Sequence, residues 1–232
     1  QDFVSAVSHE LKTPLTSIRM YGELLRQGWA SEDKKQTYYA YIHDESERLS
    51  RLIDNVLQLA RVTRNELRLD PRGVTAGTLM ADVRPKIAST VEQAGFTLVT
   101  DCAPEAAGAV IEVDPDAFSQ ILINLVDNAV KFSARSPRKA VEVGCRSGPH
   151  DRVLFSVRDY GPGVPKDQMR QIFRLFYRAD SGLTRETPGT GIGLALVRQL
   201  VEAMGGSVEV ANREPGAEFS VAFPRARRTD AD

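Results

Sequence analysis

The 232-residue sequence predicts an α+β protein: an antiparallel helical hairpin that forms a dimeric four-helix bundle, followed by an α/β sandwich. Over residues 1–70, apolar side chains recur in steps of three and four, the period of an amphipathic helix. The segment DPRG at 70–73 breaks this pattern and is typical of a linker. From 74 to 224, helical patterns alternate with short strand patterns. We therefore expect a helical domain at 1–70, an α+β domain at 74–224 and a flexible tail at 225–232.

The first predicted helix covers residues 1–28 and ends near Gly28, a residue suited to a helix C-terminus. Ser31, followed by two acidic residues, is typical of the N-terminal cap of a second helix. The apolar face of the first helix carries Phe3, Val7, Leu11, Pro14, Ile18, Tyr21 and Leu25.

A second helix is predicted over residues 33–68. Its heptad positions are Tyr38, Ile42, Glu45, Leu49, Leu52, Val56 and Leu59, of which only Glu45 is polar. Two such helices joined by a short loop form a hairpin, and a single hairpin leaves much of its apolar face exposed. We therefore expect a homodimer through the 1–70 hairpin. Packing of the same face on the downstream domain is the alternative.

The downstream domain should contain three helices and several strands. Helices are expected at 77–94, 115–133 and 189–204. Strands are expected at 96–101 and 109–113, with hairpins formed by 141–143 and 153–157 and by 207–211 and 217–223.

Composition narrows the class of protein. Hydrophobic residues make up 42% and charged residues 26% of the chain, as in soluble globular proteins. The net charge of −1 gives no electrostatic reason to expect nucleic acid as a partner. The two cysteines, Cys102 and Cys145, lie far apart without metal-type spacing, so we expect a reducing compartment and no disulfide framework. The sequence begins at Gln1, close to a helix, so we expect a fragment whose membrane contact lies in missing segments.

The segment SHELKTPL at 8–15 carries the first candidate chemistry. His9 lies about 200° of helical rotation from Val7, so it should point away from the apolar face toward water. Thr13 lies one turn later on nearly the same face. A neutral imidazole offers a nucleophilic nitrogen near pH 7, and the neighbouring Glu10 can accept a hydrogen bond from its other nitrogen. On its own, a solvent-facing histidine is usually an ordinary surface residue.

Three downstream segments together indicate a nucleotide site. In NLVDNAVKF at 124–132, Asn124 and Asn128 lie one helical turn apart, and their carboxamide oxygens suit magnesium. In DYGPG at 159–163, Asp159 follows a strand and can accept a hydrogen bond from an exocyclic amine such as that of adenine. In GTGIGL at 189–194, glycines precede a helix whose N-terminal N–H groups can bind phosphate. Each segment alone is weak, and a cap or a turn would explain it.

The order of these segments resembles the catalytic core of a bacterial sensor histidine kinase. Residues 1–68 resemble the dimerisation and histidine-phosphotransfer (HisKA) domain, and 74–224 resemble the GHKL-type (HATPase_c) ATP-binding domain. The segment at 8–15 is similar to the H-box, 124–132 to the N-box, 159–163 to the G1 box and 189–194 to the G2 box. FRLFYR at 173–178 is similar to the F-box, and a lid is expected at 164–190. Arg174 stands where the family often has an acid, so no role is assigned to it.

The resemblance implies ATP and Mg²⁺ as cofactors and His9 as the phosphoryl acceptor, with Glu10 as its helper. Asn124 and Asn128 would hold the magnesium, while Asp159 would read the adenine amine. Phosphate contacts would come from Lys131 and Arg178. The remaining nucleotide contacts implied by the boxes are Phe132, Gly161, Gly163, Thr190, Gly191, Ile192, Gly193 and Leu194.

The resemblance also implies transfer of the phosphoryl group to an aspartate on the receiver domain of a response regulator. Thr13 occupies the position that serves regulator dephosphorylation in related kinases, so we expect a bifunctional kinase and phosphatase. Pro14 removes a helical hydrogen bond to the Glu10 carbonyl, and bending there would let the ATP-binding domain reach His9. The expected setting is a cytoplasmic domain of an inner-membrane sensor. A non-catalytic ATP-binding scaffold and a gyrase-like ATPase clamp are the rival interpretations.

Overall fold

The structure is a computed structural model that describes residues 2–63, 68–175, 177 and 191–226. Contacts between residues divide the chain into two compact units, Gln1–Glu66 and Leu67–Asp232, which we call the hairpin unit and the catalytic unit. Among the described residues, no helix combines the length and apolar character that crossing a bilayer requires.

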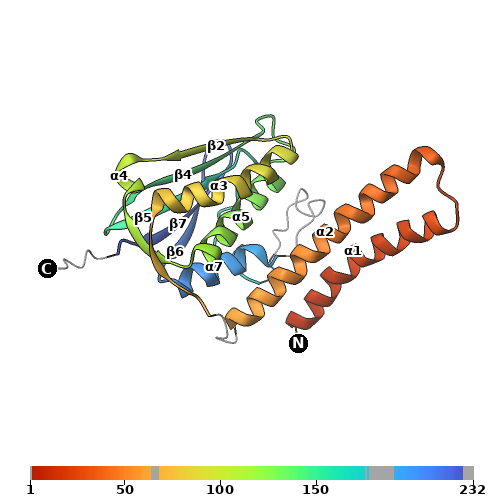
Figure 1. Cartoon of the computed structure of the whole chain (residues 1–232), viewed down its shortest axis with the longest axis horizontal. Coiled ribbons are helices and arrows are strands. Elements are labelled where there is room, and N and C mark those ends of the chain that lie inside the picture. The colour runs from red at the N-terminus through yellow and green to blue at the C-terminus, as the bar shows by residue number, and fades with distance from the viewer. Residues whose placement is uncertain (1, 64–67, 176, 178–190, 227–232) are drawn as a thin grey trace. The chain divides into compact units, whose positions relative to one another are not determined.

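The hairpin unit consists of two antiparallel helices, α1 (Asp2–Arg26) and α2 (Glu32–Thr63) (Figure 1). Helix α1 ends in a Schellman motif, in which the Gly28 N–H donates to the Leu25 carbonyl and the Trp29 N–H donates to the Leu24 carbonyl. Gly28 adopts a φ of 70°, a left-handed conformation that glycine tolerates without cost. The glycine therefore ends the helix and turns the chain back toward α2.

The heptad pattern of α2 describes which side chains face α1. Leu52 and Leu59 are buried, and the other heptad positions, including Glu45, are half-buried. On α1, Tyr21 contacts the rings of Tyr38 and Tyr41 at centroid distances of 5.1 and 5.0 Å. Large apolar side chains nevertheless remain exposed on both helices, namely Leu15, Met20, Ile53 and Leu57.

The catalytic unit contains a five-stranded sheet in the order β2-β4-β5-β7-β6. Its strands are β2 (Thr97–Cys102), β4 (Ala140–Gly148), β5 (Arg152–Arg158), β6 (Ser207–Asn212) and β7 (Ala217–Pro224). The β2–β4 pair is parallel and the other pairs are antiparallel. A two-stranded antiparallel sheet joins β1 (Arg72–Thr75) to β3 (Val110–Val113).

Three helices lie side by side over one face of the large sheet: α3 (Ala76–Gln93), α5 (Pro115–Phe132) and α7 (Gly193–Ala203) (Figure 1). Helix α5 is the central one, and its buried Phe118 contacts Phe155 of β5 and Phe223 of β7 at centroid distances of 4.7 and 6.2 Å. Its N-terminus is fixed by Asp114, whose Oδ1 accepts hydrogen bonds from the N–H groups of Asp116 and Ala117.

Two short elements differ from the sequence-based expectations. The segment predicted as a linker at 70–73 runs into strand β1, because Arg72 and Gly73 pair with Val113 and Glu112 of β3. A short helix, α4 (Pro104–Ala107), follows β2 and was not predicted. Four-residue elements carry too little periodic pattern to be recognised without their pairing partners. The other predicted helices and strands are present with bounds within about five residues of those expected. Residues 64–67 of the second predicted helix and 189–190 of the last one lie outside the described residues.

Candidate functional site

His9 projects from α1 into solvent, as its position on the helix predicts. Its side chain is 81% exposed, and its Nδ1 lies 3.8 Å from Oε1 of Glu10. The Glu10 side chain is only 15% exposed, so the carboxylate is held against the hairpin while the imidazole stays accessible. The pair can orient one ring nitrogen by a hydrogen bond and leave the other free to attack.

A second histidine on the hairpin shows that this local geometry is not specific. His43 on α2 is 75% exposed, and its Nδ1 lies 3.6 Å from Oδ1 of Asp44. The difference is in the carboxylate, because Asp44 is 76% exposed whereas Glu10 is largely covered. His43 is therefore a natural internal control for His9.

Thr13 and Pro14 follow His9 by one helical turn. Thr13 donates its Oγ1 hydrogen bond to the His9 carbonyl at 3.4 Å, and its side chain is exposed. Pro14 is buried within a helix that continues on both sides of it. Because proline has no N–H, Pro14 cannot donate the usual helical hydrogen bond to the Glu10 carbonyl.

Asn124 lies in the middle of α5 and is buried, with 6% of its surface exposed. Its Nδ2 has no hydrogen-bond partner, and its Oδ1 accepts only a long bond of 3.4 Å from Gln120 Nε2 among the contacts that the structure gives. A Cβ built on Gly193, the first residue of α7, would lie 4.0 Å from this oxygen. The structure thus places Gly193 of the 189–194 segment close to Asn124 of the 124–132 segment. The buried Asn124 carboxamide does not use its full hydrogen-bonding capacity in the contacts that the structure gives.

Asp159 is also buried, with 5% exposed, at the end of β5. Its Oδ1 accepts hydrogen bonds from the N–H groups of Gly161 and Ala217 at 2.8 and 3.2 Å. Burial raises the pKa of Asp159, and these two hydrogen bonds oppose the rise. The carboxylate is therefore rigidly placed, and burying it without hydrogen-bond donors would cost free energy. Both properties are expected of a group that binds the amine of a ligand.

Glycines allow the loop around Asp159 to pack as closely as it does. A Cβ on Gly161 would lie 2.8 Å from the carbonyl oxygen of Phe132, at the C-terminal end of α5. A Cβ on Gly216 would lie 1.9 Å from the carbonyl oxygen of Asp159, and Gly216 has a φ of 98°. Gly216 was not predicted as a site residue; it could have been suspected only as part of the Pro-Gly turn at 215–216.

Tyr160 also fixes the loop that contains Asp159, through partners on other segments. Its hydroxyl donates to Oε1 of Glu142, and its ring lies 3.8 Å from the guanidinium carbon of Arg138 and 4.8 Å from that of Arg158. Ser136 donates its hydroxyl to the Tyr160 carbonyl at 2.7 Å. No sequence motif marks these partners, because they come from separate segments.

The remaining predicted residues lie around the same helix. Asn128 and Lys131 are half-buried on α5, and Phe132 is 40% exposed beneath the Lys131 ammonium, 5.5 Å from its ring centroid. Gly163 has a φ of 78° and precedes Val164, whose backbone exchanges two hydrogen bonds with the Asn212 side chain. At the start of α7, Ile192 is fully buried, and Gly191, Gly193 and Leu194 are half-buried.

The predicted phosphate contacts Arg178 and Thr190, and about half of the predicted lid at 164–190, lie outside the described residues. In the described part of the F-box, Phe173 is buried and contacts Phe219 of β7 at 6.2 Å between ring centroids, whereas Arg174 is exposed. Position 173 therefore fastens this segment to the sheet.

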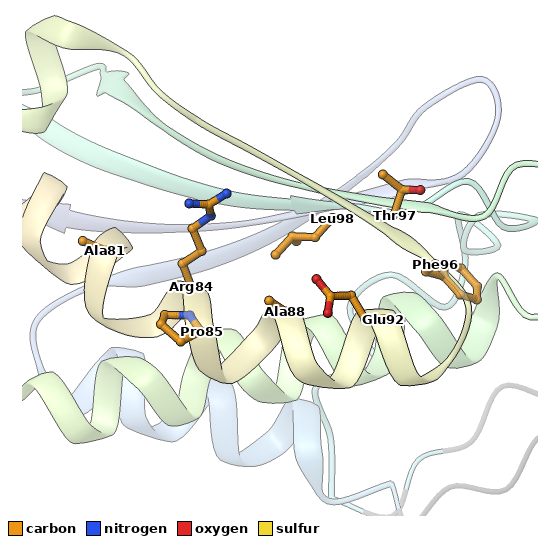
Figure 2. A pocket seen from close by; sticks show the side chains of 8 residues that line it. All are labelled: Ala81, Arg84, Pro85, Ala88, Glu92, Phe96, Thr97 and Leu98. Carbon is orange, nitrogen blue, oxygen red and sulfur yellow. The ribbon is translucent and has the colours of Figure 1, made fainter.

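A groove of about 610 Å³ lies elsewhere in the catalytic unit, between α3 and the edge strand β2 (Figure 2). It is lined by Ala81, Arg84, Pro85, Ala88, Glu92, Phe96, Thr97 and Leu98. None of these residues belongs to the predicted boxes, so the groove is separate from the candidate nucleotide site.

The two units define a class of protein: a helical hairpin with an exposed histidine joined to an ATP-binding sandwich of the GHKL type. Residues 1–65 match the family described as His Kinase A (phospho-acceptor) domain. Residues 113–227 match the family described as Histidine kinase-, DNA gyrase B-, and HSP90-like ATPase. The chain belongs to the sensor histidine kinases of two-component systems.

Individual proteins support this placement. The circadian input-output histidine kinase CikA of Synechococcus elongatus is 34% identical over 226 residues, which cover 96% of this chain and 30% of CikA. The structure of full-length ShkA in complex with AMPPNP aligns with a TM-score of 0.66 at 29% identity, covering 97% of this chain and 46% of ShkA. The structure of histidine kinase ThkA in complex with the response regulator protein TrrA has a TM-score of 0.72 at 22% identity, covering 97% and 62% of the two chains. The chain spans about a third of the length of the curated relatives it matches.

Proposed function

We propose that this chain is the catalytic core of a sensor histidine kinase that phosphorylates itself on His9 with ATP and passes the phosphoryl group to an aspartate of a response regulator. The observation that carries the proposal is that the chain combines an accessible imidazole beside a covered carboxylate with a second unit whose motifs lie around α5. Neither feature alone excludes a scaffold or an ATPase.

His9 acts as the nucleophile. Glu10 accepts a hydrogen bond from one ring nitrogen, fixes the tautomer and stabilises the cation that forms as the other nitrogen attacks the terminal phosphate. The bond from that phosphorus to the β–γ bridging oxygen breaks, and ADP leaves. The exposure of His9 suits a phosphoramidate that must next meet a second protein.

The catalytic unit holds the nucleotide. Asp159 accepts a hydrogen bond from the adenine amine in addition to those from the Gly161 and Ala217 N–H groups. Glycines at the start of α7 present N–H groups to the phosphates. AMPPNP bound to ShkA, a relative at 29% identity, is consistent with this site.

Asn124 and Asn128 are the proposed magnesium ligands, with Lys131 and Arg178 at the phosphates. The fit rests on Asn124, a buried side chain whose hydrogen-bonding capacity is incompletely used and whose carboxamide oxygen is a hard donor. Magnesium would neutralise charge on the phosphates during transfer.

Two further parts of the proposal concern partners. The exposed apolar side chains on α1 and α2 would be covered by the second hairpin of a homodimer, as membership in the phospho-acceptor family supports.

A receiver domain would approach His9 on the hairpin. ThkA, which shares the fold and was solved with TrrA, offers a fold-level analogy for that contact. Thr13, with its exposed hydroxyl, would position water when the regulator is dephosphorylated.

The test is autophosphorylation with γ-labelled ATP and magnesium. We expect the chain to acquire label that acid removes and alkali does not, and we expect His9→Gln to abolish it. The matched control is His43→Gln, because His43 is equally exposed and has its own carboxylate neighbour. Label that persists in His9→Gln, or disappears in His43→Gln alone, would exclude the proposed acceptor.

The same preparation separates the rival functions. A scaffold would bind nucleotide without acquiring label, and an ATPase clamp would release inorganic phosphate without a labelled protein intermediate. Binding of a fluorescent ATP analogue to His9→Gln with wild-type affinity would show that the variant is folded and that only the acceptor is lost.

A further inference from the structure

The two cysteines, which are far apart in sequence, face each other across the β2–β4 pair. In this parallel pair, Cys102 stands directly opposite Cys145. The N–H of Ala103 donates to the carbonyl of Cys145 at 2.8 Å, so the strands are still joined one residue beyond Cys102. The two Cα positions are therefore held in register and cannot splay apart.

Both side chains lie on the same face of the sheet. Along β2, exposed Thr97, Val99 and Asp101 alternate with half-buried Leu98, Thr100 and Cys102. Along β4, Cys145 continues the buried alternation of Val141 and Val143. Because side chains of directly paired residues project to one face, the two thiols are neighbours on the helix-covered side of the sheet.

This juxtaposition satisfies the Cα separation that a disulfide requires. Paired strands lie about 4.8 Å apart, and a disulfide needs Cα atoms roughly 4.4–6.8 Å apart with Cβ atoms directed toward one side. Both cysteines are free thiols in the structure.

We propose that Cys102 and Cys145 form a reversible intramolecular disulfide when the protein meets a two-electron oxidant such as hydrogen peroxide. The proposal is independent of the kinase function proposed above, since neither cysteine belongs to the candidate site. It is compatible with the sequence-based expectation of a reducing compartment and no disulfide framework, since the bond would form only on oxidation.

The two thiols differ in exposure, and this difference determines which of them reacts first with the oxidant. Cys102 is half-buried, whereas Cys145 is 3% exposed. Burial, together with the neighbouring Cys102 thiol, raises the pKa of Cys145, which keeps it protonated. Cys102 therefore reacts first: its sulfur attacks the peroxide, the O–O bond breaks, and the proton lost from the thiol joins the departing hydroxide, so that a sulfenic acid and water are formed. The Cys145 sulfur then displaces the sulfenic oxygen, its proton leaves with that oxygen as water, and the S–S bond forms.

The bond would join an edge strand to the interior of the sheet. Strand β2 has only β4 as a neighbour, and it borders the groove shown in Figure 2. A covalent link at its C-terminal end would restrain local opening of this edge.

The test follows disulfide formation in the reduced, purified protein after addition of hydrogen peroxide. Free thiols are blocked with N-ethylmaleimide, and the protein is digested with trypsin without reduction. We expect the tryptic peptides 87–131 and 140–146 to be joined, with a mass about 2 Da below their sum, and to separate on addition of dithiothreitol. Cys102→Ser and Cys145→Ser should each abolish the joined product.

Folding provides the decisive control, since the register holds the thiols together only in the native state. We expect the joined product to form at least about tenfold faster in the folded protein than in the same protein unfolded in urea. Three results would overturn the proposal: both cysteines remaining free to react with N-ethylmaleimide, oxidation of Cys102 to sulfinic acid without a cross-link, or a disulfide that joins two copies of the chain.

Discussion

The two candidate sites of this protein are built in opposite ways. On the hairpin, His9 is 81% exposed and has one loose neighbour, the Glu10 carboxylate at 3.8 Å. In the catalytic unit, Asp159 is 5% exposed and receives two backbone hydrogen bonds. Its loop is closed by Gly161 and Gly216, which leave no room for a Cβ.

This difference matches what each site has to recognise. A phosphoryl acceptor reacts first with the nucleotide held by the catalytic unit and then with a receiver domain. It must therefore be accessible to two domains, which an exposed helical face allows. A carboxylate that reads one amine of a small ligand must be preorganised and dehydrated, so it is fixed by backbone. Substitutions in the loop around Asp159 should therefore change the stability of the catalytic unit. Substitutions at the His9 site should change the phosphoryl chemistry without changing the stability of the hairpin unit.

The largest expected effect on stability is that of Gly216→Ala. The new methyl would lie 1.9 Å from the Asp159 carbonyl oxygen at a φ of 98°, so the loop or β7 must move. We expect a loss of roughly 3 kcal/mol or more in the free energy of unfolding, measured by urea denaturation and circular dichroism. Gly205→Ala is the control, because Gly205 has a φ of 73° with open space around it. It should cost only about 1 kcal/mol, and equal losses would show that close packing plays no part.

Asp159→Asn should separate binding from stability. The amide keeps an oxygen for the Gly161 and Ala217 N–H groups but offers a donor to the adenine amine, so ATP affinity should fall at least about tenfold.

Because the pKa of Asp159 is raised by burial, the folded state holds its proton more tightly than the unfolded chain does. The contribution of Asp159 to stability therefore falls as pH rises from the ordinary carboxyl pKa through the raised one.

The asparagine variant lacks this titration, so its stability at pH 7 should equal or exceed that of the wild type. Thermal melts at pH 4 and pH 7, together with titration of a fluorescent nucleotide, measure both effects. A variant that binds ATP normally would remove Asp159 from the nucleotide site.

Thr13→Ala tests the hairpin at a residue whose hydroxyl contacts only backbone among the hydrogen bonds described. We expect dephosphorylation of a phosphorylated receiver domain to fall about tenfold, while autophosphorylation on His9 changes less than about twofold. Thr13→Ser, which keeps the hydroxyl, should retain most of the phosphatase rate. A loss of autophosphorylation in Thr13→Ala with the phosphatase rate unchanged would contradict the assignment.

The smallest expected effect on folding is that of His9→Gln. An exposed side chain with one neighbour at 3.8 Å contributes little, so the free energy of unfolding should change by less than about 0.5 kcal/mol. Urea denaturation measures this value. A marked loss of stability would mean that His9 supports the hairpin, and the contrast between the two sites would fail.

Periodicity was sufficient to predict the helices and most strands, since long elements repeat their pattern many times. The heptad of α2, including the half-buried Glu45, describes the side chains that face α1. The short elements β1 and α4 were missed, because β1 exists through its pairing with β3 and α4 is a single turn. The motif residues of the candidate nucleotide site were predicted from their type and order, whereas Gly216, Ser136 and Tyr160 were not assigned a role in positioning.

The sequence by itself determined the local chemistry: a histidine beside a glutamate on the polar face of a helix, paired asparagines one turn apart, and glycines where the chain must turn. These are consequences of helical and strand periods, which a linear pattern expresses directly. Tertiary structure decided which distant residues meet. It brought Gly193 close to Asn124, placed Gly216 against Asp159 and put Cys102 opposite Cys145. Strand register and helix packing bring together residues remote in the chain, and no short-range pattern contains that information.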